Sequence, residues 1–332
     1  MLLSASHLKV VLISCISLGL FSVANGQANA SNASPKTTQV ETQTESYRAE
    51  GFASIRKMDW ISANRSFDAA LSISPNDAPS LYGKALAQFN LNDIAGSSSA
   101  LDSLILILAG EKRDQSLLAD SLVLSAVISS IQNRTSDAIG KLQHAIELIP
   151  QHFDAHLSLG RIYFGSGQID SSILSFRKAV LIQPENIQAR FFLATALERA
   201  ENAAEALSEY RRILKANPEN VEGNLGLGVL LVKIEGASSP EGLRALRSAV
   251  RLDPGSYEGQ ITLGKTLVKL DRAAEAVEHL RRAIELAPGN PEPHFQLSLA
   301  YRKLGKTADA DAEADIVKRI HESRRGVSTL PK

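Results

Sequence analysis

The sequence is poor in the residues on which disulfide frameworks and nucleic-acid binding depend. Its 332 residues include one cysteine and one tryptophan, and aromatic residues make up only 5%. Cys15 has no second cysteine to pair with, so packing alone has to hold the fold together. Basic and acidic residues number 36 each, so the excess positive charge that displaces counterions from phosphates is absent. We therefore expect no nucleic acid among the partners.

The most apolar stretch lies near the N-terminus and is typical of a secretory signal. Residues 10–24 form a nearly unbroken apolar run, preceded by Lys9 and followed by small residues up to Gly26 and Ala30. The run is shorter than the roughly 20 residues that a membrane-spanning helix needs. We predict a signal peptide over residues 1–26, cleaved after Gly26 or Ala30, and hence a periplasmic or secreted protein.

Two alternatives remain for this segment. The apolar run could be retained as an uncleaved anchor, which is the only membrane contact that we expect. Leu12 to Cys15 is somewhat similar to the box before a lipidated cysteine in bacterial lipoproteins, although apolar residues continue after it. Residues 27–43 are mostly Ala, Asn, Ser, Thr and Gln with little to bury, and we expect them to form a disordered spacer.

A unit of about 34 residues recurs through the rest of the chain. In the copy from Phe153 to Asn186, apolar residues at spacings of three and four predict two amphipathic helices, joined by the short segment 165–168. The prolines that end successive units are 34, 34, 36 and 34 residues apart: Pro150, Pro184, Pro218, Pro254 and Pro288. Most are followed two residues later by a good N-cap: Asn186, Asn220, Ser256 and Asn290, and likewise Asp77 after Pro75. His152 is the exception.

The copy at residues 153–186 has the spacing of the tetratricopeptide signature at Leu159, Gly160, Tyr163, Gly167, Phe176, Ala179 and Pro184. The sequence thus resembles the tetratricopeptide repeat family over most of its length. The resemblance implies an all-α fold, a right-handed superhelical solenoid of helix-turn-helix repeats whose first helices line a concave groove. We expect seven or eight repeats over residues 44–325 and a disordered tail over residues 326–332.

Several local expectations follow from the repeat. Gly160 and Ala179 are expected where two helix backbones approach closely. In the second repeat, Ser97 to Ser99 stand where small apolar residues usually pack, and the run Leu104 to Leu108 predicts a helix buried on most sides. The third repeat is expected at residues 119–152.

Candidate catalytic and metal-binding groups are sparse. His152 and His156 are four residues apart, as two metal ligands on a helix are, but a third ligand is lacking. His156 and His294 occupy the same position of their repeats, where we expect packing between helices. There is no glycine-rich phosphate loop and no Ser/His/Asp arrangement in a suitable context. We expect no enzyme activity, cofactor, metal or small-molecule substrate.

The resemblance also implies a binding surface, because the second, fifth, ninth, twelfth and thirteenth residues of each first helix face the groove in this family. From the fourth repeat onward, the apolar and basic residues at these positions are Leu157, Arg161, Phe164, Phe191, Arg199, Leu225, Val229, Lys233, Ile261, Lys265, Val268, Lys269, Phe295, Arg302 and Lys303. An apolar strip with a basic edge suits an extended or helical protein segment that carries acidic residues. Alternatively, these bases belong to a solvated face and suit the helix dipole. The acids at the second position are assigned to capping.

The sequence therefore predicts a non-catalytic scaffold that binds protein or peptide partners along its groove. The alternative is a subunit of an envelope machine for polysaccharide export or outer-membrane assembly, in which the array grips other subunits or a glycan. The Lys and Asn pair with which chaperone-binding members of the family hold a terminal carboxylate is absent from the corresponding positions.

Overall fold

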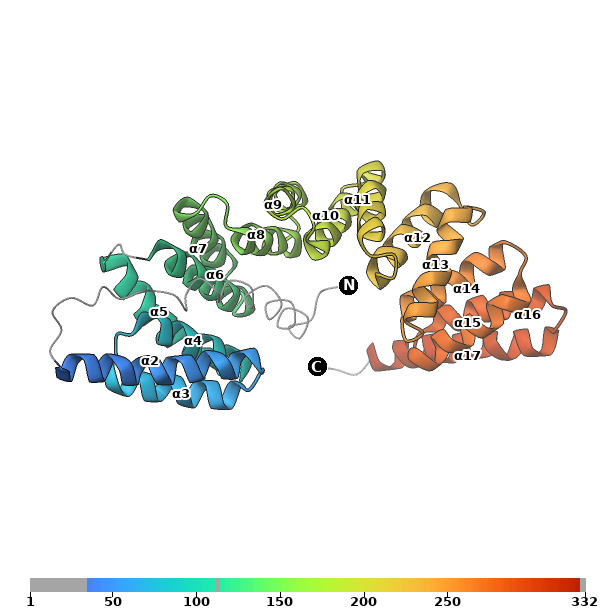
Figure 1. The fold of residues 1–332 in the computed structure, drawn as a ribbon. Coiled ribbons are helices and arrows are strands. Elements are labelled where there is room, and N and C mark those ends of the chain that lie inside the picture. Colours follow the sequence, from blue (N-terminus) through green and yellow to red (C-terminus); the bar gives the residue numbers. More distant parts are fainter. Residues whose placement is uncertain (1–34, 112–113, 329–332) are drawn as a thin grey trace. The chain divides into compact units, whose positions relative to one another are not determined.

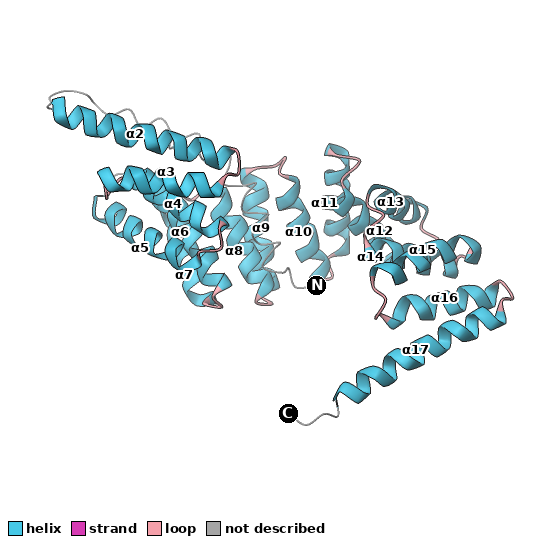
Figure 2. Ribbon diagram, turned by 90° about the horizontal axis from the view of Figure 1, so that it is seen from below, coloured by secondary structure: helices cyan, strands magenta, loops and turns pink. Residues whose placement is uncertain are grey.

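The computed structural model describes residues 35–111 and 114–328, and these residues form α-helices joined by short turns, without a strand (Figures 1 and 2). They fall into two compact units, of which unit 1 ends at Pro184 and unit 2 begins at Glu185. The expected all-α repeat solenoid is confirmed. The predicted signal peptide over residues 1–26 lies outside the described residues.

Unit 1 contains four pairs of consecutive helices, and each pair packs side by side (Figure 1). The pairs are α2 (Pro35–Arg56) with α3 (Trp60–Ile73), α4 (Ala78–Asn90) with α5 (Ile94–Glu111), α6 (Gln115–Ile131) with α7 (Thr135–Leu148), and α8 (Phe153–Gly165) with α9 (Ile169–Ile182). Their apolar faces meet in a continuous core that includes Phe67, Leu101, Leu124 and Leu142, all fully buried.

Unit 2 repeats the same arrangement. Its pairs are α10 (Ile187–Arg199) with α11 (Ala203–Ala216), α12 (Val221–Glu235) with α13 (Pro240–Leu252), α14 (Tyr257–Lys269) with α15 (Ala273–Leu286), and α16 (Pro291–Lys303) with α17 (Thr307–Ser328). Each second helix also packs against the first helix of the next pair, so every hairpin buries its apolar side against its neighbour.

The glycine at the eighth position of a repeat makes room for a large side chain. A Cβ atom on Gly160 would lie 2.5 Å from Cδ1 of Phe176, and one on Gly264 would lie 2.7 Å from the Leu280 side chain. A small residue is therefore required at Gly160, as expected, but the group that approaches it is the Phe176 ring rather than another backbone.

The predicted N-caps are confirmed. Asp77, Asn186, Asn220, Ser256 and Asn290 each accept a hydrogen bond from a backbone amide in the first turn of the next helix. The expectation that no cap stands at position 152 is wrong, because Nδ1 of His152 accepts from the Ala155 amide at 3.2 Å.

The turn inside each repeat has a feature that the sequence analysis did not identify. The fifteenth residue has a positive φ in most repeats, including non-glycine residues such as Met58 (58°), Glu201 (59°) and Asp271 (61°). Here the chain leaves the first helix through a left-handed residue, and the next amide bonds back to the end of that helix, as Asn202 N does to Leu197 O at 2.9 Å. The position favours glycine, which only some repeats have.

The helix boundaries differ from expectation at three places. Helix α2 begins at Pro35, so residues 35–43 are helical rather than the disordered spacer predicted from composition; proline suits the start of a helix. Helix α6 begins at Gln115, capped by Asp114, and not at residue 119. Helix α17 continues to Ser328, so residues 326–328 are helical, while 329–332 lie outside the described residues.

Helix α5 is less buried than expected. Leu104 and Leu108 are in the core, but the Leu106 side chain is 77% exposed, so the apolar run faces solvent on one side. Ser97 is fully buried in place of a small apolar residue, because its hydroxyl donates to the Ala85 carbonyl at 2.7 Å. Among the described residues, no helix combines the length and the apolar character needed to cross a bilayer.

Candidate functional site

The predicted groove residues are divided between the two units. Leu157, Arg161 and Phe164 lie on α8 in unit 1, and the others lie on α10, α12, α14 and α16 in unit 2. In unit 2 each of these helices contacts the next, so they line one surface. We call the side formed by their second, fifth, ninth, twelfth and thirteenth residues the first-helix face of unit 2.

Only some of the predicted apolar residues are available on this face. Phe295 is 50% exposed, and Phe191, Leu225 and Val229 are partly buried. Ile261 and Val268 are 7% and 4% exposed and belong to the core around α14, so they cannot contact a partner. In unit 1, Leu157 is likewise buried at 3% exposure.

The predicted basic residues of unit 2 fall into two groups. Lys265 Nζ lies 2.5 Å from Glu292, Lys303 Nζ lies 2.8 Å from Asp271, and Arg302 lies 3.9 Å from Asp311. Arg199, Lys233 and Lys269 are exposed in the last turns of α10, α12 and α14, and no described carboxylate lies within 4.0 Å of them. The second group keeps its charge available for a partner.

The acid at the second position does more than cap a helix. Asn290 caps α16 by accepting from the Glu292 amide at 3.1 Å, while the Glu292 carboxylate reaches Lys265 on α14. The assignment of these acids to capping alone is therefore wrong for Glu292, which links consecutive first helices.

Glu198, at the twelfth position of α10, is a residue of this face that sequence analysis passed over. Its carboxylate accepts a hydrogen bond from the Tyr210 hydroxyl at 3.3 Å, and the Phe191 ring centroid lies 6.4 Å from that of Tyr210. Burial raises the pKa of Glu198, the Tyr210 hydrogen bond and nearby Lys233 oppose the rise, and Glu258 adds to it. Its position in the repeat was the signal that could have identified it.

Polar side chains at the fourth position of the first helices have structural roles. In unit 2, Arg190 pairs with Glu209 at 2.7 Å, and His294 Nδ1 lies 2.6 Å from Glu313, each joining the two helices of one repeat. His156 Nε2 bonds to the Pro150 carbonyl at 3.0 Å. His156 and His294 are thus buried between helices, as expected, and the described residues contain no group of three potential ligands placed to hold a metal.

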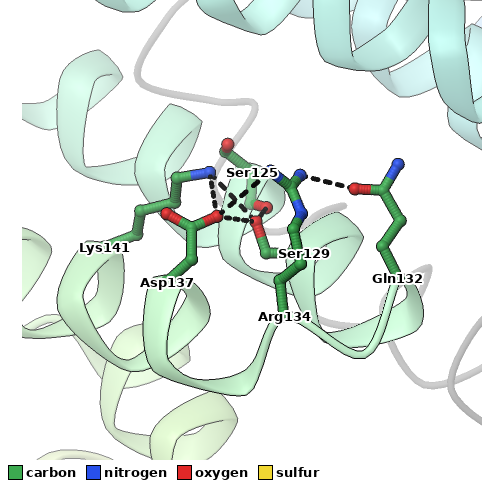
Figure 3. Close-up of polar contacts among 6 residues, drawn as sticks. All are labelled: Ser125, Ser129, Gln132, Arg134, Asp137 and Lys141. Carbon is green, nitrogen blue, oxygen red and sulfur yellow. Dashed lines mark hydrogen bonds and ion pairs between the residues drawn. The ribbon is translucent and has the colours of Figure 1, made fainter.

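A serine, a lysine and an aspartate meet where α6 ends and α7 begins (Figure 3). Ser129 Oγ lies 2.7 Å from Asp137 Oδ2 and accepts from Lys141 Nζ at 3.0 Å. The hydrogen bond from Ser129 lowers the pKa of Asp137, burial opposes this, and the Lys141 ammonium lowers the pKa further. These residue types occur in nucleophilic catalysis, but Ser129 is fully buried, so no substrate can reach its hydroxyl. The cluster joins the two helices.

A cleft of about 610 Å³ lies between α13, α14 and α15. Both of its arginines are engaged within the protein, since Arg282 bonds to Glu285 at 2.7 Å and Arg281 donates to the Tyr301 hydroxyl at 2.7 Å. His279 Nδ1 bonds to the Gln260 side-chain oxygen at 2.9 Å. The cleft has no charge preference that indicates a ligand.

Comparison with models of known protein families identifies the same repeat as the sequence analysis. Family models described as tetratricopeptide repeats match residues 153–186, 191–256 and 237–291. No curated protein matches the sequence.

Solved structures with the same fold exist. The C-terminal part of a TPR repeat-containing protein from Cytophaga hutchinsonii has a TM-score of 0.59 at 13% identity, over 76% of this chain and 99% of that one. MamA has a TM-score of 0.49 at 17% identity over 55% of this chain and 99% of its own. YrrB, described as a TPR protein with an unusual peptide-binding site, has a TM-score of 0.48 at 20% identity over 57% and 98%. At these identities the likeness concerns the fold alone.

Proposed function

Because this chain belongs to the tetratricopeptide repeat family, we propose that it is a non-catalytic scaffold that binds segments of partner proteins on the first-helix face of unit 2. The repeats support a protein-interaction role in general. The choice of this face is our proposal.

The proposal of this face rests on one observation: available apolar side chains and available cations occur together on it. Phe191, Leu225 and Phe295 offer partly or half exposed apolar surface on α10, α12 and α16. Lys233 and Lys269 add exposed charge in the last turns of α12 and α14. Apolar anchors supply affinity, and charges set approach and register, as in other grooves that take a helical or extended segment. Acidic residues in the partner complement these cations.

The test compares two triple charge reversals in the full chain. One replaces Arg199, Lys233 and Lys269 by Glu on the first-helix face, and the control replaces Lys215, Arg244 and Arg251, which are exposed on second helices. Proteins captured by cross-linking from the native source are then bound to each variant. We expect binding to be lost with the first triple and kept with the control, at unchanged helicity by circular dichroism. Equal binding by both variants would place the site elsewhere.

We also propose that the protein acts outside the cytoplasm. The apolar run at residues 10–24 and the small residues after it support export. Mass spectrometry of the protein from its native source should find an N-terminus at Gln27 or Ser31, and an intact Met1 would contradict cleavage.

A further inference from the structure

We propose that the first-helix face of unit 2 selects a partner helix with acidic residues along one flank and basic residues along the other, and fixes its direction. This inference rests on the proposed function and deepens it. It starts from the acids at the second position, which the sequence analysis had set aside as helix caps.

One end of the lining helices is acidic. Glu222, Glu258 and Glu292 stand in the first turns of α12, α14 and α16, and all three are exposed. Capping does not need their carboxylates, because Asn220 and Ser256 accept from the Gly223 and Gly259 amides at 2.7 and 3.1 Å.

Two observations place these acids beside the other residues of the face. The Glu292 carboxylate bonds to Lys265, which stands at the ninth position of the preceding first helix. Glu258 raises the pKa of Glu198, at the twelfth position of α10, so its charge reaches the same surface. Glu222 and Glu258 are therefore available to a bound segment, whereas Glu292 is paired with Lys265.

The other end is basic. Arg199, Lys233, Lys269 and Lys303 stand in the last turns of α10, α12, α14 and α16. Lys303 is paired with Asp271, and Glu198 places one half-buried acid near Lys233. The exposed charge in this row is nevertheless positive, because Arg199, Lys233 and Lys269 have no described carboxylate within 4.0 Å.

The distance between the two rows fits a helix. Glu222 and Lys233 are 11 residues apart on α12, as are Glu258 and Lys269 on α14. At 1.5 Å per residue the acid and the base of one lining helix are about 16 Å apart, and an α-helix with its side chains is about 10–12 Å wide. A helix that crosses the lining helices over Leu225 and Val229 then has one flank beside the acids and the other beside the bases.

The same geometry sets the length and direction of the occupant. Neighbouring packed helices are about 8–10 Å apart, so a segment that crosses four of them spans roughly 30 Å, or about 20 helical residues. Turning the segment end for end exchanges its flanks. A partner with opposite charges on its two flanks is therefore accepted in one direction only, whereas like charges in the other direction repel.

Unit 1 does not offer the same surface. On α4 and α6 the corresponding apolar residues are buried, with Tyr82, Val123 and Val127 each 4% exposed. On α8, Phe164 is partly buried and Asp154 stands in the first turn, but the last turn has no base. No acid occurs in the first turn, and no base in the last turn, of α4 or α6. Among the described residues, the combination of acids at one end of the first helices, bases at the other end and partly exposed apolar residues between them is thus a property of unit 2.

The test uses synthetic helical peptides of about 20 residues that share one leucine stripe. The polarised peptide has Glu on one flank and Lys on the other. The mixed peptide has the same composition with Glu and Lys alternating on both flanks, and the acidic peptide has Glu on both. We expect the full chain to bind the polarised peptide about tenfold more tightly than either of the others, by fluorescence anisotropy at low salt.

Equal or tighter binding of the mixed or acidic peptide would overturn the inference, and a preference for the acidic peptide would leave the proposed function standing. If no peptide binds and reversal of Arg199, Lys233 and Lys269 leaves the natural partner bound, the proposed function fails as well.

Direction is measured with a photo-cross-linker on the peptide N-terminus and mass spectrometry of the product. The polarised peptide and a second peptide with its flanks exchanged should cross-link at opposite ends of the face, one near Phe191 and the other near Phe295. Cross-links at the same end for both peptides would refute directional selection.

A charge-reversal variant completes the test. Glu222→Lys with Glu258→Lys replaces the two acids of the acidic row that have no basic partner by bases and keeps the caps, so this variant should prefer the acidic peptide over the polarised one. The control, Glu219→Lys with Glu285→Lys, reverses two exposed acids outside this face and should keep the original preference. An unchanged preference in the first variant would show that the acids take no part.

Discussion

Substitution of Gly83 by alanine tests the packing rule that a glycine of a first helix makes room for a large side chain of a second helix. Phe67 is fully buried, and its ring is enclosed by two glycines of neighbouring first helices. A Cβ atom on Gly83 would lie 2.2 Å from Phe67 Cζ, and one on Gly51 would lie 2.6 Å from Phe67 Cε1. Since ordinary contacts begin near 3.4 Å, the ring would have to move by about an ångström in a filled core.

The size of the effect follows from two opposing terms. Overpacking of a core typically costs about 1–3 kcal/mol, and we place this case near the upper end because the ring is enclosed on both sides. Alanine in a helix interior gains about 1 kcal/mol over glycine. We therefore expect Gly83→Ala to lower the free energy of unfolding by about 2 kcal/mol.

Urea denaturation followed by circular dichroism measures the change, and the chain supplies a matched control. Gly140 is an exposed glycine within α7, and nothing lies within 4 Å of an added Cβ, so Gly140→Ala should stabilise the protein by about 0.5–1 kcal/mol. In a Phe67→Leu background, Gly83→Ala should cost less than in the wild type. A Gly83→Ala protein as stable as Gly140→Ala would refute the packing rule.

Three further predictions concern single residues. His152→Asn keeps a capping side chain but, like His152→Ala, loses the contact of Nε2 with Asp120 at 3.1 Å, so it should be more stable than His152→Ala by about 1 kcal/mol in thermal or urea unfolding; equal stability of the two variants would exclude a capping role. Burial lowers the pKa of His279, so the unfolded chain takes up the proton first. The contribution of His279 to stability should be constant above about pH 6.5 and fall below it, and a His279→Gln variant with the same pH profile as the wild type would contradict this. Glu201 has a φ of 59°, so Glu201→Gly should raise stability by about 1 kcal/mol in urea unfolding, and a loss would show that the side chain matters more than the backbone.

The parts of the fold that depend on local signals could be predicted from the sequence. The spacing of the prolines predicted where each repeat ends. Side chains such as Asn220 and Ser256 cap the helices that their chemistry predicts, because an N-cap needs only the backbone amides of its own helix. Composition misjudged the start of α2, since residues of low hydrophobicity can still continue a helix whose later part is packed.

The binding face could be predicted only in part, because exposure depends on how closely neighbouring helices approach. The repeat positions identified both Ile261 and Phe295, yet the first is buried and the second is half exposed. The partner of Lys265 is on the next repeat, which no local pattern indicates. His152 was overlooked as a cap because histidine is not among the residues preferred there.

Protection of a thiol at position 295 tests the central claim most directly. In a chain without Cys15, Phe295→Cys places a reactive thiol on the first-helix face of unit 2, and Leu181→Cys places one on α9 of unit 1 at a site where leucine is 72% exposed. With saturating partner, the alkylation rate at position 295 should fall while the rate at position 181 stays the same. Unchanged alkylation at position 295 in the saturated complex would contradict binding at this face.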